Sequence, residues 1–311
     1  MKLGIIHNPF AKGNLKRPWI AGKLKEIVDD VGVFRETKNI NELPQVARDF
    51  TDQGIDTIAV NGGDGTLHLV LTAYVNTLGE DGPLPKVMSL RGGTMNTMSN
   101  SLKIKGKTQS ILEKAVDKIK KGEAFHEKDQ HLIKVNEKYG FMSGAGYISN
   151  FLDAYYSGSS TGPWQAAKLL SKLIGSATVG GTYIKEIFKE APAKVTVDGK
   201  ELDSEEYSII LCCTIAELGL GFKPTPRAYD KPDHFHMIAA DIQAPSVIPK
   251  LPSIWLGKDL SHKRIQHTGP TKEAVVEPKG NMRWMVDGEM YDAEGPLHYR
   301  VGPQVTVVEP S

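Results

Sequence analysis

Residues 62–66, Gly-Gly-Asp-Gly-Thr, have the types and the spacing that bind phosphate. The preceding residues 55–60 are mostly apolar and suit a short buried strand, whereas apolar residues within 67–74 recur at roughly helical spacing. Glycine at such a strand-to-helix junction lets backbone N–H groups approach an anion, and the helix N-terminus adds partial positive charge. We expect Thr66 to cap this helix and Asp64 to offer a carboxylate to a metal or to a sugar hydroxyl.

An ordinary Asp-Gly hairpin turn is the alternative for this tract. Three glycines together with Asp and Thr, between a strand-like and a helix-like run, favour the phosphate site instead. Three other polar or glycine-containing segments also follow strand-like runs: residues 7–14 (HNPFAKGN), Thr37 and residues 91–96 (RGGTMN). Asn8 and Thr94 can offer side-chain hydrogen bonds to a nucleotide, although a plain turn or a helix cap would also explain them.

The motifs of the first half depend on a regular alternation of strand-like and helix-like runs. The runs are strand-like at 2–8, 31–37, 55–60 and 85–90, and helix-like at 17–30, 40–50 and 67–74. This alternation predicts parallel strands joined by crossover helices, and therefore a three-layer α/β domain. Because such sheets bind ligands beyond the carboxyl ends of their strands, we expect the motifs to form one site.

The second half is richer in strands that succeed one another directly. Strand-like runs occur at 131–137, 139–144, 193–199, 206–214, 234–242, 273–278, 283–289, 297–302 and 304–310, with helical material at about 147–190 and 245–257. They predict a mainly antiparallel β-sandwich domain with helical insertions. The predicted domains are residues 1–122, which bind nucleotide, and 123–299, with the last strand, about 300–311, packing back onto the first domain.

Composition excludes several classes of protein. The formal net charge is +1, so no global charge favours nucleic acid or an acidic polymer. The N-terminal apolar run is too short for a signal peptide, and no run approaches about 18 uninterrupted apolar residues. We expect a cytoplasmic protein, with peripheral binding to the inner face of a membrane as an option. The adjacent Cys212 and Cys213 lie in an apolar run and are expected to be buried strand residues.

Four motifs together resemble the diacylglycerol kinase catalytic family, which includes bacterial lipid kinases, sphingosine kinases and ceramide kinases. They are HNPFAKGN (7–14), NGGDGTLH (61–68), RGGTMNTMSNSL (91–102) and VDGE (286–289), in this order. The resemblance implies transfer of the γ-phosphate of ATP to a lipid hydroxyl. By position it implies ATP contacts from Asn8, Thr37, Gly62, Gly63, Asp64, Gly65, Thr66, Leu67, His68, Gly93 and Thr94.

The resemblance also implies the catalytic carboxylates. Asp287 would act as the general base that accepts the proton of the lipid hydroxyl, while Mg²⁺ screens the γ-phosphate. Glu289 would orient Asp287 or a metal-bound water, and Asp64 would be the third catalytic carboxylate. An unremarkable hairpin turn is the alternative for the Asp-Gly-Glu sequence. His68 departs from the family, which usually has asparagine at this position.

Residues 227–237 (RAYDKPDHFHM) occupy the place where members of the family often carry a second Mg²⁺ site. The ligands implied are Asp230, Asp233 and the main-chain carbonyl of Phe235, since carboxylate and carbonyl oxygens suit a hard cation. His234 stands where the family usually has glycine. A polar loop before a strand is the alternative, and zinc is less favoured because no third nitrogen or sulfur ligand lies nearby.

The expected partner is a lipid substrate at a membrane surface, and a homodimer is one option for assembly. Trp164, Ala167, Leu170 and Ile174 would form one apolar stripe of a helix, with Lys168 and Lys172 beside it. We favour packing of this stripe against the protein core over contact with the membrane. An NAD-kinase-like phosphotransferase and a catalytically inactive nucleotide- or lipid-binding protein are the alternative functions.

Overall fold

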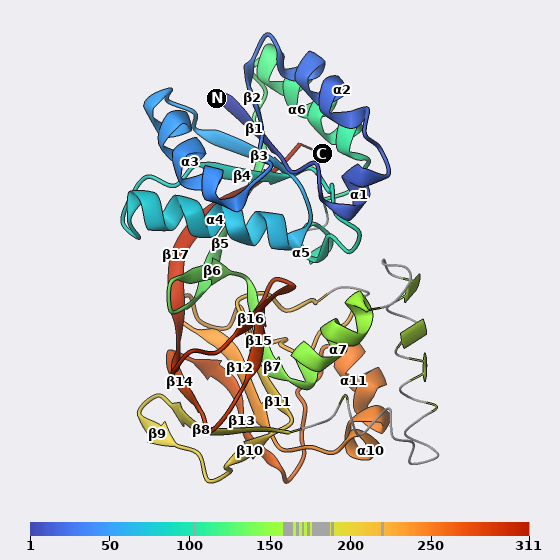
Figure 1. Ribbon diagram of the computed structural model, residues 1–311, viewed down its shortest axis with the longest axis vertical. Helices are drawn as coiled ribbons and strands as arrows, with labels where there is room; N and C mark the ends of the chain where they lie inside the picture. Colours follow the sequence, from blue (N-terminus) through green and yellow to red (C-terminus); the bar gives the residue numbers. More distant parts are fainter. Residues whose placement is uncertain are drawn as a thin grey trace. The chain divides into compact units, whose positions relative to one another are not determined.

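The chain folds into two compact units, residues 1–132 with 302–311 and residues 133–301 (Figure 1). This computed structural model describes residues 1–101, 104–157, 190–218 and 221–310, and also residues 164, 165, 168, 169, 171, 172, 175 and 187. Strands β5 (His126–Val135) and β17 (Leu297–Glu309) each begin in one unit and end in the other.

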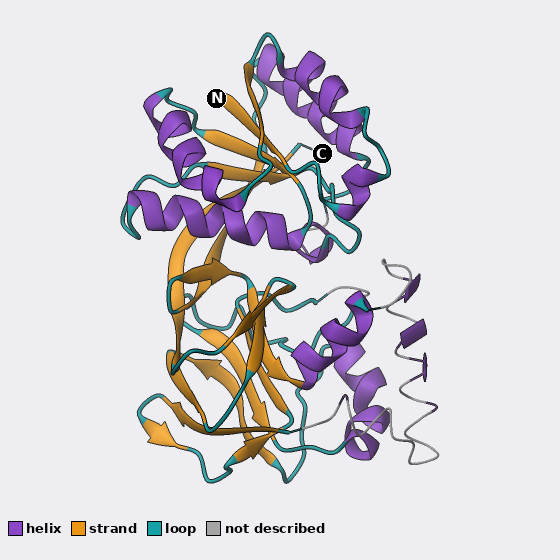
Figure 2. Ribbon diagram, in the orientation of Figure 1, coloured by secondary structure: helices purple, strands orange, loops and turns teal. Residues whose placement is uncertain are grey.

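The first unit contains a sheet of parallel strands with helices on both faces (Figure 2). The strand order is β2 (Gly32–Glu36), β1 (Leu3–His7), β3 (Thr57–Asn61), β4 (Lys86–Ser89) and the C-terminal part of β17. Helices α2 (Ile20–Val28) and α6 (Thr108–Lys121) contact each other, as do α3 (Leu43–Asp52) and α4 (Asp64–Leu78). Short helices α1 (Lys12–Leu15) and α5 (Thr97–Ser101) follow β1 and β4.

The sequence explains which strands are central and where the helices end. Every residue of β1 and of β3 is buried. This burial is expected for parallel strands that helices cover on both faces. Helix α3 buries one stripe, made of Leu43, Val46, Ala47 and Phe50. Helix α6 ends at Gly122, which adopts a left-handed conformation (φ 68°) and donates its N–H to the last turn.

The order of the strands creates a switch point beside β1. The connection after β1 leads to β2 on one side, whereas the connection after the neighbouring β3 leads to β4 on the other side. His7 and Asn61 are paired in register at the carboxyl ends of β1 and β3. In open α/β sheets the crevice outside these ends is the usual place for a ligand.

The second unit consists of two antiparallel sheets. One contains β10 (Glu206–Tyr207), β8 (Ala191–Val197), β14 (Glu273–Pro278) and the N-terminal part of β17, with β9 (Lys200–Glu201) on β8 and β6 (Lys138–Gly140) on β5. The other has the order β13 (Ile265–Thr271), β12 (Phe235–Ala240), β11 (Ile209–Cys213), β7 (Met142–Gly146), β15 (Arg283–Val286) and β16 (Glu289–Asp292).

Strand β11 is buried on both of its faces. Ile210 and Cys212 belong to the core between the two sheets, together with Val276 and Trp284. Ile209, Leu211 and Cys213 belong to a second core, which includes side chains of α7 (Tyr147–Tyr156) and α11 (Leu251–Trp255); α10 (Ala244–Val247) precedes α11. The two cysteines are free and point to opposite faces, which confirms the prediction of buried strand residues.

The predicted fold class is confirmed, with differences in detail. Strand β13 was not predicted, and β17 is one continuous strand where two runs were expected. Ala167, Leu170 and Ile174 of the predicted apolar stripe lie outside the described residues, while Trp164 is 85% exposed. Among the helices of the described residues, none has the length and apolar character needed to cross a membrane.

Candidate functional site

The site in the first unit begins with hydrogen bonds between the ends of β1 and β3. The N–H of Asn8 donates to the carbonyl of Asn61 (3.1 Å). The side-chain amide of Asn14, in α1, donates to the carbonyls of Asn8 (2.8 Å) and Asn61 (3.0 Å). The sequence alone did not identify Asn14 or Asn61 as site residues, because the contact between them joins segments that are 47 residues apart along the chain.

Glycines bring the loops after β1, β3 and β4 into backbone contact. A Cβ atom on Gly13 would lie 2.3 Å from the carbonyl oxygen of Gly92, and one on Gly93 would lie 2.4 Å from the Cα of Gly63. Any larger residue would therefore force the loops apart. We call residues 8–14, 62–66 and 91–96, which form these three loops, the cradle.

The glycine tract opens helix α4, as predicted, but Thr66 is not its cap. The N-cap is Gly63, and no side chain of a described residue caps the helix there. The Thr66 hydroxyl instead accepts a hydrogen bond from the Asn8 side-chain amide (2.9 Å). Gly62 makes room for this contact, because its Cβ would lie 2.3 Å from the Cβ of Thr66. A helix start without a side-chain cap leaves N–H groups for an anion.

Asp64 connects α4 to α5. Its carboxylate accepts hydrogen bonds from the backbone N–H groups of Thr97 (2.9 Å) and Met98 (3.0 Å), so it caps α5. Desolvation raises the pKa of Asp64, and the two backbone hydrogen bonds oppose that rise. The charge of Asp64 in turn opposes the lowering of the Arg91 pKa by burial. The catalytic role of Asp64 stays a prediction beside this observed structural one.

The loop after β4 is held in a fixed conformation. Arg91 and Asn96 both have positive φ angles, 57° and 50°. The N–H of Gly93 donates to the side-chain oxygen of Asn96 (3.1 Å), and the Asn96 amide donates back to the carbonyl of Gly93 (3.2 Å). Thr94 lies within this closed loop and is half-buried.

Thr37, Leu67 and His68, three further predicted nucleotide contacts, are all buried. Thr37 follows β2 and donates its N–H to the carbonyl of His7 (2.9 Å). The Nδ1 atom of His7 accepts a hydrogen bond from the Asn61 amide (2.8 Å), and burial lowers the pKa of His7 while Glu36 opposes that shift. Leu67 is buried and His68 is completely buried within α4, so neither side chain lies at the surface of the cradle.

In the second unit, Asp287 occupies the turn between β15 and β16. Asp287 and Gly288 both have positive φ angles, 46° and 89°, as in a two-residue hairpin turn. The carboxylate accepts hydrogen bonds from the backbone N–H groups of Phe141 (3.0 Å to Oδ2) and Met142 (2.9 Å to Oδ1).

Neighbouring residues fix the position of this turn. A Cβ on Gly140 would lie 2.6 Å from Oδ2 of Asp287, so glycine is required there. The Tyr156 hydroxyl of α7 donates to the carbonyl of Gly288 (3.2 Å). Glu289 is solvent-accessible, yet the surrounding protein raises its pKa by desolvation. Gly140 and Tyr156 could not be identified from the sequence, because they meet Asp287 only through the fold.

The predicted metal ligands of the acidic loop have other partners. Asp230 accepts from the Arg227 side chain (2.9 Å), and Asp233 contacts the His234 ring (2.7 Å). The hydrogen bond to His234 lowers the pKa of Asp233. Phe235 is buried at the start of β12. Over the described residues, no group of three or more His, Cys, Asp or Glu side chains is placed to hold a metal ion. The predicted site uses two carboxylates and a main-chain carbonyl, and it stays a prediction.

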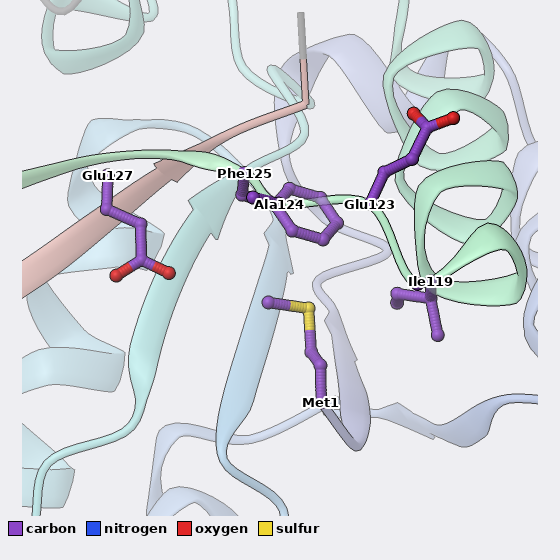
Figure 3. Close-up of a pocket in the computed structure, with 7 residues that line it drawn as sticks. Met1, Ile119, Glu123, Ala124, Phe125 and Glu127 are labelled. Atoms are coloured by element: carbon purple, nitrogen blue, oxygen red, sulfur yellow. The ribbon is translucent and has the colours of Figure 1, made fainter.

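A cavity of about 510 Å³ in the first unit lies away from the cradle. It is lined by Met1, Ile119 and Phe125 among others (Figure 3). Met1 precedes β1, and Glu127, which also lines the cavity, pairs with Lys86 at the start of β4. The cavity therefore lies at the amino ends of these parallel strands, whereas the cradle lies at their carboxyl ends.

Residues 2–125 match the family model of the diacylglycerol kinase catalytic domain. The fold is similar to that of a diacylglycerol kinase from Bacillus anthracis str. Sterne, with a TM-score of 0.63, 17% identity and coverage of 99% of this chain and 96% of that one. A second solved structure, of a protein from that strain proposed to be a diacylglycerol kinase, gives a TM-score of 0.69, 18% identity and coverage of 99% and 96%. No curated protein matches the chain.

Proposed function

Because residues 2–125 belong to the diacylglycerol kinase catalytic family, we propose that the protein is an ATP-dependent lipid kinase. It transfers the γ-phosphate of ATP to the hydroxyl of a lipid of the diacylglycerol, sphingoid or ceramide type. The observation that carries the proposal is the cradle, in which Gly13, Gly63 and Gly93 let three loops meet backbone to backbone at the switch point of the sheet.

The cradle has the features that a triphosphate requires. The α4 N-terminus presents backbone N–H groups and partial positive charge to phosphate oxygens, and the absence of Cβ atoms at Gly62, Gly63 and Gly93 permits close approach. Asn8, Thr37 and Thr94 would provide side-chain hydrogen bonds to the nucleotide. When bound with ATP, Mg²⁺ would neutralise the negative charge that develops on the transferred phosphate, and Asp64 is the cradle carboxylate that would hold it.

Asp287 would act as the general base. The lipid hydroxyl oxygen forms a bond to the γ-phosphorus, the bond from that phosphorus to the β–γ bridging oxygen breaks, and ADP departs. The hydroxyl proton passes to the carboxylate of Asp287, whose position is fixed by the N–H groups of Phe141 and Met142. Glu289, two residues further along the chain, would help to orient Asp287 or a metal-bound water.

The proposal is tested with Asp287→Asn. We expect transfer of labelled phosphate from ATP to diacylglycerol, sphingoid base or ceramide to fall by at least about 100-fold, because the amide cannot accept the proton. Binding of a fluorescent ATP analogue should be unchanged, since Asp287 is outside the cradle. Asp292→Asn is the matched control, because Asp292 ends the same hairpin with an exposed side chain and should retain full activity.

Other outcomes would contradict specific parts of the proposal. A fully active Asp287→Asn enzyme would remove Asp287 from the mechanism. Phosphorylation of NAD, offered as acceptor in a parallel assay, in place of any lipid would identify an NAD-kinase-like enzyme. Binding of ATP without turnover on any fractionated lipid extract would identify an inactive nucleotide-binding protein.

A further inference from the structure

The segment that follows β1 exposes large apolar side chains. Phe10, Leu15 and Trp19 are 60%, 60% and 59% exposed. These three residues lie within one short stretch around helix α1 (Figure 1). Large exposed apolar side chains within ten residues of chain are one feature of an interaction surface.

The same segment is strongly basic, although the whole chain is nearly neutral. Residues 8–25 contain Lys12, Lys16, Arg17, Lys23 and Lys25 but no Asp or Glu, whereas the formal net charge of the chain is +1. Lys12 and Lys16 are exposed beside Leu15. The cores of protein–protein interfaces are depleted of charged residues, so alternating cations and apolar groups fit a protein partner poorly. They fit an anionic bilayer, where apolar groups enter the interface and cations meet the headgroups.

One side of this segment belongs to the cradle. Asn14, at the middle of the segment, is buried and holds the carbonyls of Asn8 and Asn61. Gly13 packs against the carbonyl of Gly92, and the Arg17 side chain donates to the carbonyl of Gly13 (3.1 Å). A surface that binds this segment would therefore hold the rim of the cradle close to it.

We propose that residues 8–25, here named the docking segment, bind the surface of an anionic lipid bilayer. Phe10, Leu15 and Trp19 enter the boundary between headgroups and acyl chains, and the neighbouring cations contact anionic headgroups. The choice of partner rests on the proposed function, because a lipid acceptor must be reached at a bilayer. The binding itself requires neither ATP nor catalysis.

The test is flotation of the intact protein with vesicles in the absence of ATP. The vesicles contain phosphatidylcholine alone or with roughly a third phosphatidylglycerol, an anionic lipid. Wild type should float with the anionic vesicles, and its binding should weaken as salt is raised. The variant Phe10→Ser/Leu15→Ser/Trp19→Ser should bind these vesicles at least about tenfold more weakly, because the apolar area no longer enters the bilayer.

One further variant is a control for the loss of an exposed apolar side chain, and another measures how much the positive charges contribute to vesicle binding. Ile40→Ser is the matched control, since Ile40 is 51% exposed in the first unit but lies outside the basic segment; its binding should equal that of wild type. Lys16→Gln/Lys25→Gln should lose roughly fivefold in affinity for anionic vesicles for each charge removed. Thermal unfolding checks the fold, and Trp19→Ser alone is measured if the triple variant melts early.

The proposal is overturned if wild type does not float, or if the triple variant binds like wild type. It is also overturned if the triple variant keeps its vesicle binding but converts a dimer to a monomer in light scattering, since the patch would then be a protein interface. Phosphate transfer to a short-chain lipid in detergent micelles tests the kinase separately. A wild-type protein that phosphorylates lipid in micelles but does not float with anionic vesicles would therefore contradict the docking segment and leave the proposed function intact.

Discussion

At the scale of single residues, His236 is held in its neutral form. Its Nδ1 accepts the N–H of Arg227 (3.1 Å), so the proton must be on Nε2, which donates to the Thr268 hydroxyl (3.2 Å). The ring is completely buried, and desolvation lowers the pKa of His236 to about 4, although Asp259 and Asp230 oppose this shift. Protonation of Nδ1 would turn it into a donor that faces the N–H of Arg227, so this hydrogen bond would be lost.

This arrangement predicts that acid destabilises the second unit. The folded-state pKa lies below the unfolded value of 6.5, so the stabilisation is present above pH 6.5 and is lost as pH falls toward 4. The free energy of unfolding should fall by up to about 3 kcal/mol from this group over that interval. Urea unfolding at several pH values should give a smaller decrease for His236→Gln than for wild type. Equal decreases in both proteins would show that His236 does not cause the acid sensitivity.

At the scale of elements, the cradle depends on glycines at the points where its loops meet backbone to backbone. Gly93→Ala should therefore be harmful, because the added Cβ would lie 2.4 Å from the Cα of Gly63 and only backbone movement could relieve the clash. We expect the unfolding free energy to fall by about 1–3 kcal/mol, since overpacking forces such shifts. Binding of an ATP analogue, measured by fluorescence anisotropy, should weaken by at least about tenfold.

Gly22→Ala is the control for this prediction. Gly22 lies inside α2, and a Cβ there would meet no described atom within 4 Å. Alanine in a helix interior is favoured over glycine by roughly 0.5–1 kcal/mol, so this variant should be slightly more stable and bind ATP normally. If Gly93→Ala behaved like Gly22→Ala, the loops would not need backbone contact to bind the nucleotide.

The same elements show what the sequence can and cannot predict. The sequence locates β1 and β3 because each is a continuous buried run, and it locates α4 because its apolar residues recur at helical spacing. Strand β13 has no such pattern, since it contains Gly269 and Pro270 in a half-buried run. The positions of Asn14 and Gly140 beside Asn61 and Asp287 follow from the packing of distant segments, which local periodicity does not encode.

At the scale of the whole molecule, the chain builds two cores from strands that interleave along the sequence. The end of the chain returns to the first unit, where Val307 of β17 pairs with Val87 of β4 and is 3% exposed. In the second unit, Val276 of β14 is completely buried in the core between the two sheets. Each valine thus belongs to a different compact unit.

The two units should respond separately to loss of core packing. Val307→Ala and Val276→Ala each remove two carbon atoms from a buried site and should each cost about 2 kcal/mol locally. Native-state hydrogen exchange with peptide-level mass spectrometry should show faster exchange in β3 and β4 for Val307→Ala, and in β11 and β12 for Val276→Ala. If either variant accelerated exchange equally in all four strands, the chain would unfold as one cooperative body, and the C-terminal strand would stabilise both cores together.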